Sequence, residues 1–218
     1  MRQYLAEVFG TFTLVFAGCG AVVVNSLSGG AITHPGIALT FGLVVMAMIY
    51  AVGEVSGAHI NPSVTIAFGL AGRFPAQKIP GYIISQLIGA FLASLLLHAL
   101  FKENTVFLGT TLPKDGKEMQ SFVLEIVMTL FLMMVILGVS QGSKEVGTLA
   151  GIAIGGLIAL DALFGGPISG ASMNPARSIA PAVVSGKLDH LWIYIAGPII
   201  GAAAAVPLWM ATRKTDTK

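Results

Sequence analysis

Six stretches of this chain are apolar over about 20 residues, the length that a helix needs to cross a membrane core ~30 Å thick. They cover residues 4–25, 36–55, 80–101, 119–140, 147–165 and 190–211. Charged residues make up 10% of the chain, against about 25% in ordinary soluble proteins. The sequence therefore predicts an all-α membrane protein in contact with lipid. The net charge of +2 gives no basic surface for a nucleic acid.

Two further apolar segments, 61–70 and 174–184, are too short to cross the membrane. A helix of about ten residues covers ~15 Å, which is half of the membrane core. Asn is a favoured N-cap, and Pro is favoured at the first helical position. We therefore expect two half-helices that begin inside the membrane. Each begins with the same pair of residues, at Asn61-Pro62 and at Asn174-Pro175.

The order of these segments occurs twice along the chain. The sequence YLAEVFGTFTLVF from Tyr4 corresponds to FVLEIVMTLFLMM from Phe122, and SGAHINPS corresponds to SGASMNPA. Each half contains three spans, so the second half must insert with the opposite orientation. We predict one channel-like domain over 1–218, built from inverted repeats at about 4–101 and 119–211, with the two half-helices meeting near the midplane.

The meeting point of the half-helices would gather polar groups at the middle of the membrane. Each helix N-terminus carries roughly half a positive charge, which repels cations, while the amides of Asn61 and Asn174 can donate hydrogen bonds. Extended backbone at this depth is tolerated where it lines a water-filled path, and such a path suits water or small neutral solutes better than ions. The backbone carbonyls expected along it belong to Gly57, Ala58, His59, Gly170, Ala171 and Ser172.

The positions of Lys and Arg favour both termini on the cytoplasmic side of the membrane, and the short tails suggest a plasma (inner) membrane. With that orientation, the cytoplasmic segments contain Arg2, Arg73, Lys78, Lys144, Arg213, Lys214 and Lys218. The opposite side contains fewer, namely Lys102, Lys114, Lys117 and Lys187.

The whole chain resembles the major intrinsic proteins, the aquaporins and glycerol facilitators, through SGAHINPSVTIAF and GPISGASMNPARSIAPAVVSG. Within this family, FAGCGAVVVN and RFPAQKIPGYIISQ are most similar to the nodulin-like intrinsic proteins and their bacterial relatives. The resemblance implies an hourglass of six tilted spans plus two half-helices, and a homotetramer with one pore per subunit. It also implies that the pore is lined by both complete motifs, Asn61, Pro62, Ser63 and Asn174, Pro175, Ala176.

The resemblance further implies a selectivity filter formed by Phe41, Ala162, Ala171 and Arg177. Arg177 is also a candidate on chemical grounds, because a charge within the membrane is costly and usually functional. Water-selective members usually carry histidine at the position of Ala162, so we expect a wider and more apolar filter here. This combination is closest to the nodulin-like type, which is associated with glycerol and with metalloid hydroxides such as arsenite or boric acid, alongside water.

Three carboxylates are candidates beside this set. Glu7 and Glu125 occupy equivalent places in the repeat, and we expect both to face the interior, because a carboxylate in lipid is costly. The resemblance implies that both accept hydrogen bonds from the re-entrant loops and hold them. Glu54 stands where many family members have histidine. We expect it either to hydrogen-bond the first loop or to tune a pH-sensitive gate in the cytoplasmic vestibule.

The main functional prediction is a passive channel for water and small neutral solutes that excludes ions and protons. A strictly water-selective channel is the first alternative. An ion-coupled secondary transporter is the second, because such proteins also combine inverted repeats with broken helices. The sequence contains no recognisable catalytic cluster or metal-ligand spacing, so no enzymatic activity, metal or cofactor is expected.

Overall fold

The computed structural model describes residues 1–101, 107–140 and 148–213, and these residues form helices and loops without strands. Six helices are long and apolar enough to cross a membrane, which confirms the predicted all-helical membrane fold. They are α1 (Arg2–Leu27), α2 (Thr33–Ser56), α4 (Ile79–Leu100, preceded by a 3-10 turn at Ala76–Lys78), α5 (Glu118–Val139), α7 (Ala150–Ser169) and α9 (Ile193–Thr212). Among the charges used to predict the orientation, Lys102, Lys144, Lys214 and Lys218 lie outside the described residues.

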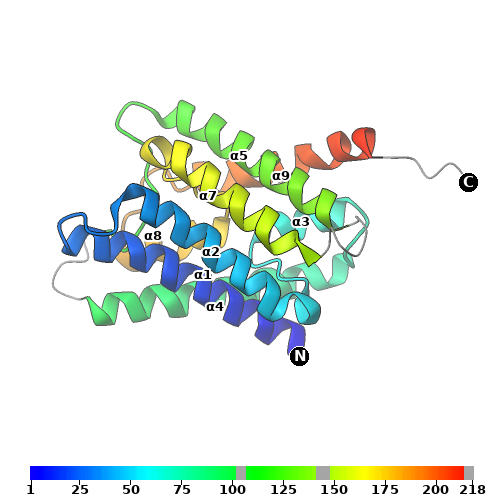
Figure 1. Cartoon of the computed structure of the whole chain (residues 1–218), viewed down its shortest axis with the longest axis horizontal. Coiled ribbons are helices and arrows are strands. Elements are labelled where there is room, and N and C mark those ends of the chain that lie inside the picture. The colour runs from blue at the N-terminus through cyan, green and yellow to red at the C-terminus, as the bar shows by residue number, and fades with distance from the viewer. Residues whose placement is uncertain (102–106, 141–147, 214–218) are drawn as a thin grey trace, which may run out of the picture.

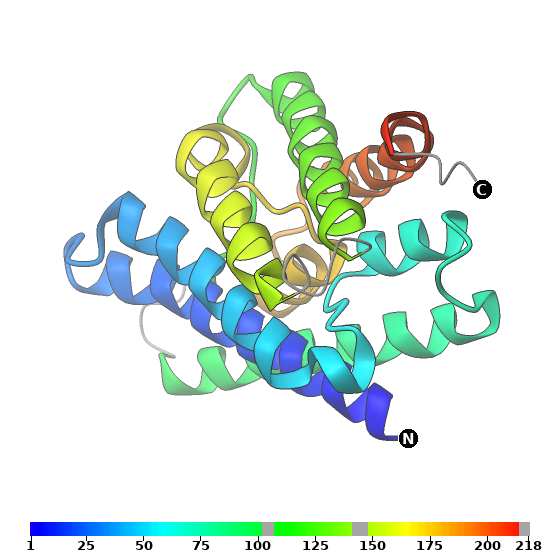
Figure 2. The same cartoon turned by 45° about the vertical axis from the view of Figure 1, so that its right-hand side comes forward.

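The two half-helices are α3 (Pro62–Leu70) and α8 (Pro175–Ser185). They lie toward opposite ends of the bundle, and the N-terminus of the chain and the end of α9 lie at the same end (Figure 1). The rotated view in Figure 2 shows both short helices among the long ones. Each half-helix is therefore surrounded by spans that bury its backbone.

The end of α7 differs most from its predicted boundary. The prediction ends at Gly165, the first residue of a Gly-Gly-Pro sequence, whereas α7 continues through Pro167 to Ser169. Proline removes one backbone donor from a helix, so the carbonyl of Leu163 loses its partner four residues later. That carbonyl lies 2.8 Å from Nε2 of His34 instead. The predicted start of this span, residue 147, lies outside the described residues.

Glycines allow equivalent pairs of long helices to cross closely in the two halves. A Cβ atom added to Gly89 of α4 would lie 2.2 Å from the carbonyl oxygen of Val8 in α1. A Cβ atom added to Gly201 of α9 would lie 2.1 Å from the carbonyl oxygen of Ile126 in α5. Small residues of this kind are typical of helix contacts in membranes, where lipid gives no hydrophobic drive for association.

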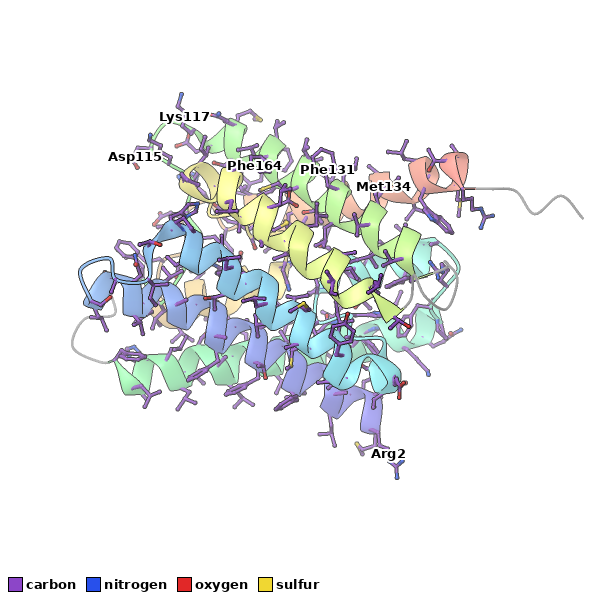
Figure 3. The ribbon with its side chains drawn as sticks, viewed as in Figure 1. Arg2, Asp115, Lys117, Phe131, Met134 and Phe164 are labelled. Carbon is purple, nitrogen blue, oxygen red and sulfur yellow. The ribbon has the colours of Figure 1, made fainter. Side chains whose placement is uncertain are left out.

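The outer surface is apolar along the middle of the molecule and charged at its ends. Phe131 of α5 and Phe164 of α7 are 44% and 48% exposed, and Figure 3 shows both on the outside of the bundle. Arg2 lies at one end of the molecule and Asp115 and Lys117 at the other (Figure 3). This distribution is that of a multi-pass membrane protein whose apolar belt faces lipid.

The close crossing of α5 and α9 predicts that Gly201→Ala destabilises the fold by about 1–3 kcal/mol, because the new methyl group overlaps a backbone carbonyl. Gly156→Ala is the matched control. A Cβ atom at Gly156 meets no described atom within 4 Å, so this change should leave stability the same or slightly raised. Thermal unfolding in detergent measures both, and equal midpoints would contradict the proposed crossing.

Candidate functional site

The N-termini of the two half-helices are capped by the predicted asparagines. Oδ1 of Asn61 accepts a hydrogen bond from the backbone N–H of Ser63 at 2.9 Å. Oδ1 of Asn174 accepts from the N–H of Ala176 at 3.0 Å and of Arg177 at 3.4 Å. Proline at the first helical position follows both caps, where its missing N–H has no intrahelical role.

The same asparagines join the two half-helices to each other. Nδ2 of Asn61 donates to the carbonyl of Met173 at 2.8 Å, and Nδ2 of Asn174 donates to the carbonyl of Ile60 at 2.9 Å. The helix ends therefore face each other in the interior, and each amide retains one further N–H. Sequence reasoning treated both amides as donors to a passing solute and missed this reciprocal pair, for which the sequence gives no signal.

The two loops before the half-helices share an unusual backbone conformation. Residues other than glycine seldom adopt a positive φ, and holding one there costs on the order of 1–3 kcal/mol. The strained loops must therefore be held by their surroundings. The positive φ angles occur at the same three places in each loop, at Gly57 (83°), Ala58 (46°) and Ile60 (41°) and at Gly170 (83°), Ala171 (43°) and Met173 (53°).

Glu7 of α1 holds the first loop. Its carboxylate is fully buried and accepts hydrogen bonds from the N–H groups of His59 and Ile60, at 2.9 and 2.7 Å. It also accepts from the hydroxyl of Ser56 and from the side-chain amide of Gln86, both at 2.7 Å. Four donors thus meet one carboxylate, which compensates for the loss of water around it.

Glu125 of α5 holds the second loop in the same way. It is also fully buried and accepts from the N–H groups of Ser172 and Met173, at 2.9 and 2.8 Å. The hydroxyl of Ser169 donates to it at 2.8 Å. The serine before each loop was missed by sequence reasoning, although both stand at the same place in the repeated SGA sequence.

The support of the two loops differs in one respect. Gln86 of α4 donates to Glu7 and also to the hydroxyl of Thr65, whereas the repeat places Pro198 at the corresponding position of α9. The hydroxyl pair of Ser172 and Ser178 in the second loop corresponds to the pair of His59 and Thr65 in the first, so it does not replace Gln86. Fewer described side chains therefore hold Glu125 than hold Glu7.

Two cavities run along the inside of the bundle and share the side chains of Phe41 and Arg177. The central cavity, of about 150 Å³, is lined by both asparagines and lies on one side of this pair. The mouth cavity, of about 200 Å³, lies on the other side and is lined by residues that include His34 and Ala162. Phe41 and Arg177 thus mark the boundary between two parts of one path.

The side chain of Arg177 is fixed at this boundary. Its Nη1 donates to the carbonyl of Gly109 at 2.7 Å and lies 3.4 Å from Sγ of Cys19. Its Cζ lies 4.9 Å from the centre of the Phe41 ring, within range of a cation–π contact. Gly109 has a φ of +69°, and a Cβ atom there would lie 2.8 Å from that of Cys19, so only glycine fits. Sequence reasoning found Arg177 and Phe41 but missed Gly109.

The remaining predicted residues divide between the two cavities, the surface and the interior, where Pro62, Ser63, Pro175 and Ala176 are buried and line neither cavity. Glu54 is exposed, lies beside Arg2 in a surface groove, and makes no hydrogen bond to the first loop within the described residues. The mouth cavity is lined by Ala162 and Gly170. The central cavity is lined by Gly57, Ala58, His59, Ala171 and Ser172.

The contacts of Glu125 predict that Glu125→Gln destabilises the fold by about 1–3 kcal/mol, because an amide NH₂ replaces an oxygen that accepts a buried N–H. The exposed Glu54 provides the matched change, Glu54→Gln, for which we expect a difference within about 0.5 kcal/mol. Thermal unfolding of both purified variants checks this. A Glu125→Gln variant as stable as the wild type would show that the carboxylate does not hold the loop.

Comparison with known proteins gives consistent matches over the whole chain. A family model described as "Major intrinsic protein" matches residues 1–209. The chain is 49% identical to Aquaporin NIP1-1 of Zea mays and 46% identical to Nodulin-26 of Glycine max, over 99% of its own length and 76% and 79% of theirs. The X-ray structure of the aquaglyceroporin from Plasmodium falciparum matches with a TM-score of 0.88 at 25% identity, covering 97% of this chain and 96% of that one.

These matches agree with the six spans, the paired half-helices and the polar path between them. The resemblance to plant nodulin-like aquaporins that the sequence motifs indicated is confirmed. The chain belongs to the major intrinsic protein family and is a passive membrane channel, not an enzyme.

Proposed function

We propose that this channel conducts water and small neutral solutes, above all glycerol, and excludes ions and protons. Metalloid hydroxides such as arsenite and boric acid belong to the same class, being small, uncharged and rich in hydroxyl groups. The single observation that carries the proposal is the small side chain of Ala162 on the wall of the mouth cavity, beside the boundary formed by Phe41 and Arg177.

The proposed filter consists of Phe41, Ala162, Ala171 and Arg177. Arg177 offers hydrogen-bond donors, while the Phe41 ring and the two alanines give apolar surface and leave space. A polyol has hydroxyl groups on one side and C–H groups on the other, so it suits a passage with one polar and one apolar wall. A bulky polar side chain at position 162 would narrow the passage and favour water alone.

Exclusion of cations is supported by the charges around the path. The N-termini of α3 and α8 meet at the central cavity, and each carries roughly half a positive charge. Arg177 adds a full positive charge at the boundary between the cavities. Among the described residues, no Asp or Glu lines either cavity, so a cation would find no compensating carboxylate there. This also argues against an ion-coupled transporter.

We further propose a homotetramer with one pore per subunit, placed in the plasma or inner membrane with both termini in the cytoplasm. The relatives named aquaporins and the larger number of Lys and Arg residues in the segments assigned to that side support this arrangement. The aquaglyceroporin named among the solved structures supports the proposed range of solutes.

Stopped-flow light scattering of proteoliposomes tests the proposed function, with water, glycerol and arsenite measured in parallel. We expect flux of all three to be linear in the gradient and independent of Na⁺ and H⁺. A wild-type channel that passes water and rejects the other two would be strictly water-selective. Saturable, ion-dependent flux would identify a transporter and contradict the proposal.

The variant Ala162→His tests the filter itself. We expect the ratio of glycerol to water permeability to fall by at least about tenfold, because the imidazole removes the space that a carbon chain needs. Ala162→Gly is the matched control and should keep glycerol permeation, since it adds no bulk. An unchanged ratio in Ala162→His would show that this position does not set selectivity.

A further inference from the structure

A histidine, His34, lies at the mouth of the pore. His34 is in the first turn of α2, seven residues before Phe41, and therefore on the same face of this helix. Its side chain is partly exposed and lines the mouth cavity together with Phe41, Ala162 and Arg177. A solute that enters from this side meets His34 before it reaches Arg177.

The imidazole of His34 is held by the break that Pro167 makes in α7. Pro167 has no N–H, so the carbonyl of Leu163 has no partner four residues later in the helix. Nε2 of His34 lies 2.8 Å from this carbonyl oxygen. Leu163 directly follows Ala162 in the chain, so the imidazole is tied to the wall of the proposed filter.

Gly166, next to Pro167, leaves room for the imidazole of His34 against α7. A Cβ atom added to Gly166 would lie 2.7 Å from Cε1 of His34, so the ring packs directly against the backbone of α7. The contact with Gly166 and the hydrogen bond to Leu163 together fix the ring on the wall of the cavity. A side chain that is fixed in advance loses little conformational entropy when it binds a solute.

The hydrogen bond also determines the chemistry of the other ring nitrogen. A carbonyl oxygen only accepts, so Nε2 carries the hydrogen, and in the neutral ring Nδ1 is then an acceptor. Within the described residues Nδ1 has no protein partner, whereas three other polar groups of the mouth cavity are already engaged. The carbonyl of Gly109 accepts from Arg177, and the hydroxyls of Thr110 and Thr111 pair with serines.

We propose that His34 is a solute-binding residue of this channel, where Nδ1 accepts a hydrogen bond from a water or polyol hydroxyl at the mouth of the pore. Arg177 offers donors and His34 an acceptor, so a hydroxyl group that leaves bulk water finds both kinds of partner along the path. The inference rests on the channel function alone and not on the range of solutes. Water is therefore the primary probe, and glycerol the second.

Stopped-flow permeability of proteoliposomes tests this with four single variants and one double variant, at equal protein content and after thermal unfolding has shown that each is folded. His34→Leu should lower water permeability about two- to tenfold, the effect of one lost hydrogen bond. His34→Gln should restore most of this loss, because its amide can donate to Leu163 and still offer an oxygen. His98→Leu, at an exposed position on α4, is the matched control and should match the wild type.

The fourth variant, Pro167→Ala, leaves His34 in place. Its new N–H can donate to the Leu163 carbonyl and release the imidazole. We therefore expect the same loss of water permeability as in His34→Leu, and no further loss when Pro167→Ala and His34→Leu are combined. Wild-type water permeability in both His34→Leu and Pro167→Ala would overturn the proposal. A His34→Gln channel with water permeability as low as that of His34→Leu would also overturn it. If His34→Leu does not fold, the comparison of Pro167→Ala with wild type decides. Failure of glycerol permeation in the wild type would contradict only the proposed solute range.

Discussion

Two buried carboxylates hold the non-helical backbone in the interior of this membrane protein. Backbone at membrane depth needs hydrogen-bond partners within the protein, and here it is also strained by positive φ angles. Glu7 and Glu125 each accept from two consecutive backbone N–H groups and a serine hydroxyl. These contacts hold each loop just before the point where its half-helix begins.

The position of the half-helices then determines what the pore can conduct. The crossed hydrogen bonds of Asn61 and Asn174 keep the two helix ends face to face, and the positive ends of the helix dipoles disfavour cations. We propose that selection among neutral solutes takes place elsewhere, at the boundary between the cavities and at the mouth. There Arg177 is anchored by Gly109, and His34 is anchored by Leu163. The centre and the mouth of the path thus have different roles.

Much of this arrangement could be predicted from the sequence, because it rests on lengths and on a repeat. The order of residues along the chain is enough to show the span lengths, the two Asn-Pro pairs and the equivalent positions of Glu7 and Glu125. Contacts between distant segments were not predictable in this way. The approach of Gly109 to Arg177, the reciprocal bonds of the asparagines and the pairing of His34 with Leu163 depend on where loops and helices meet in space. The continuation of α7 beyond residue 165 was not predictable for the same reason, because a tertiary donor replaces the one that Pro167 removes.

We propose that the two half-helices form a path that neutral molecules can cross and that ions and protons cannot. The most direct test is to record ionic current and water flux together, with the purified channel in a planar bilayer under an osmotic gradient and a proton gradient. We predict water flux that rises with the amount of channel, with no accompanying cation or proton current. A cation or proton current that scales with the water flux would contradict the proposed exclusion of ions and protons.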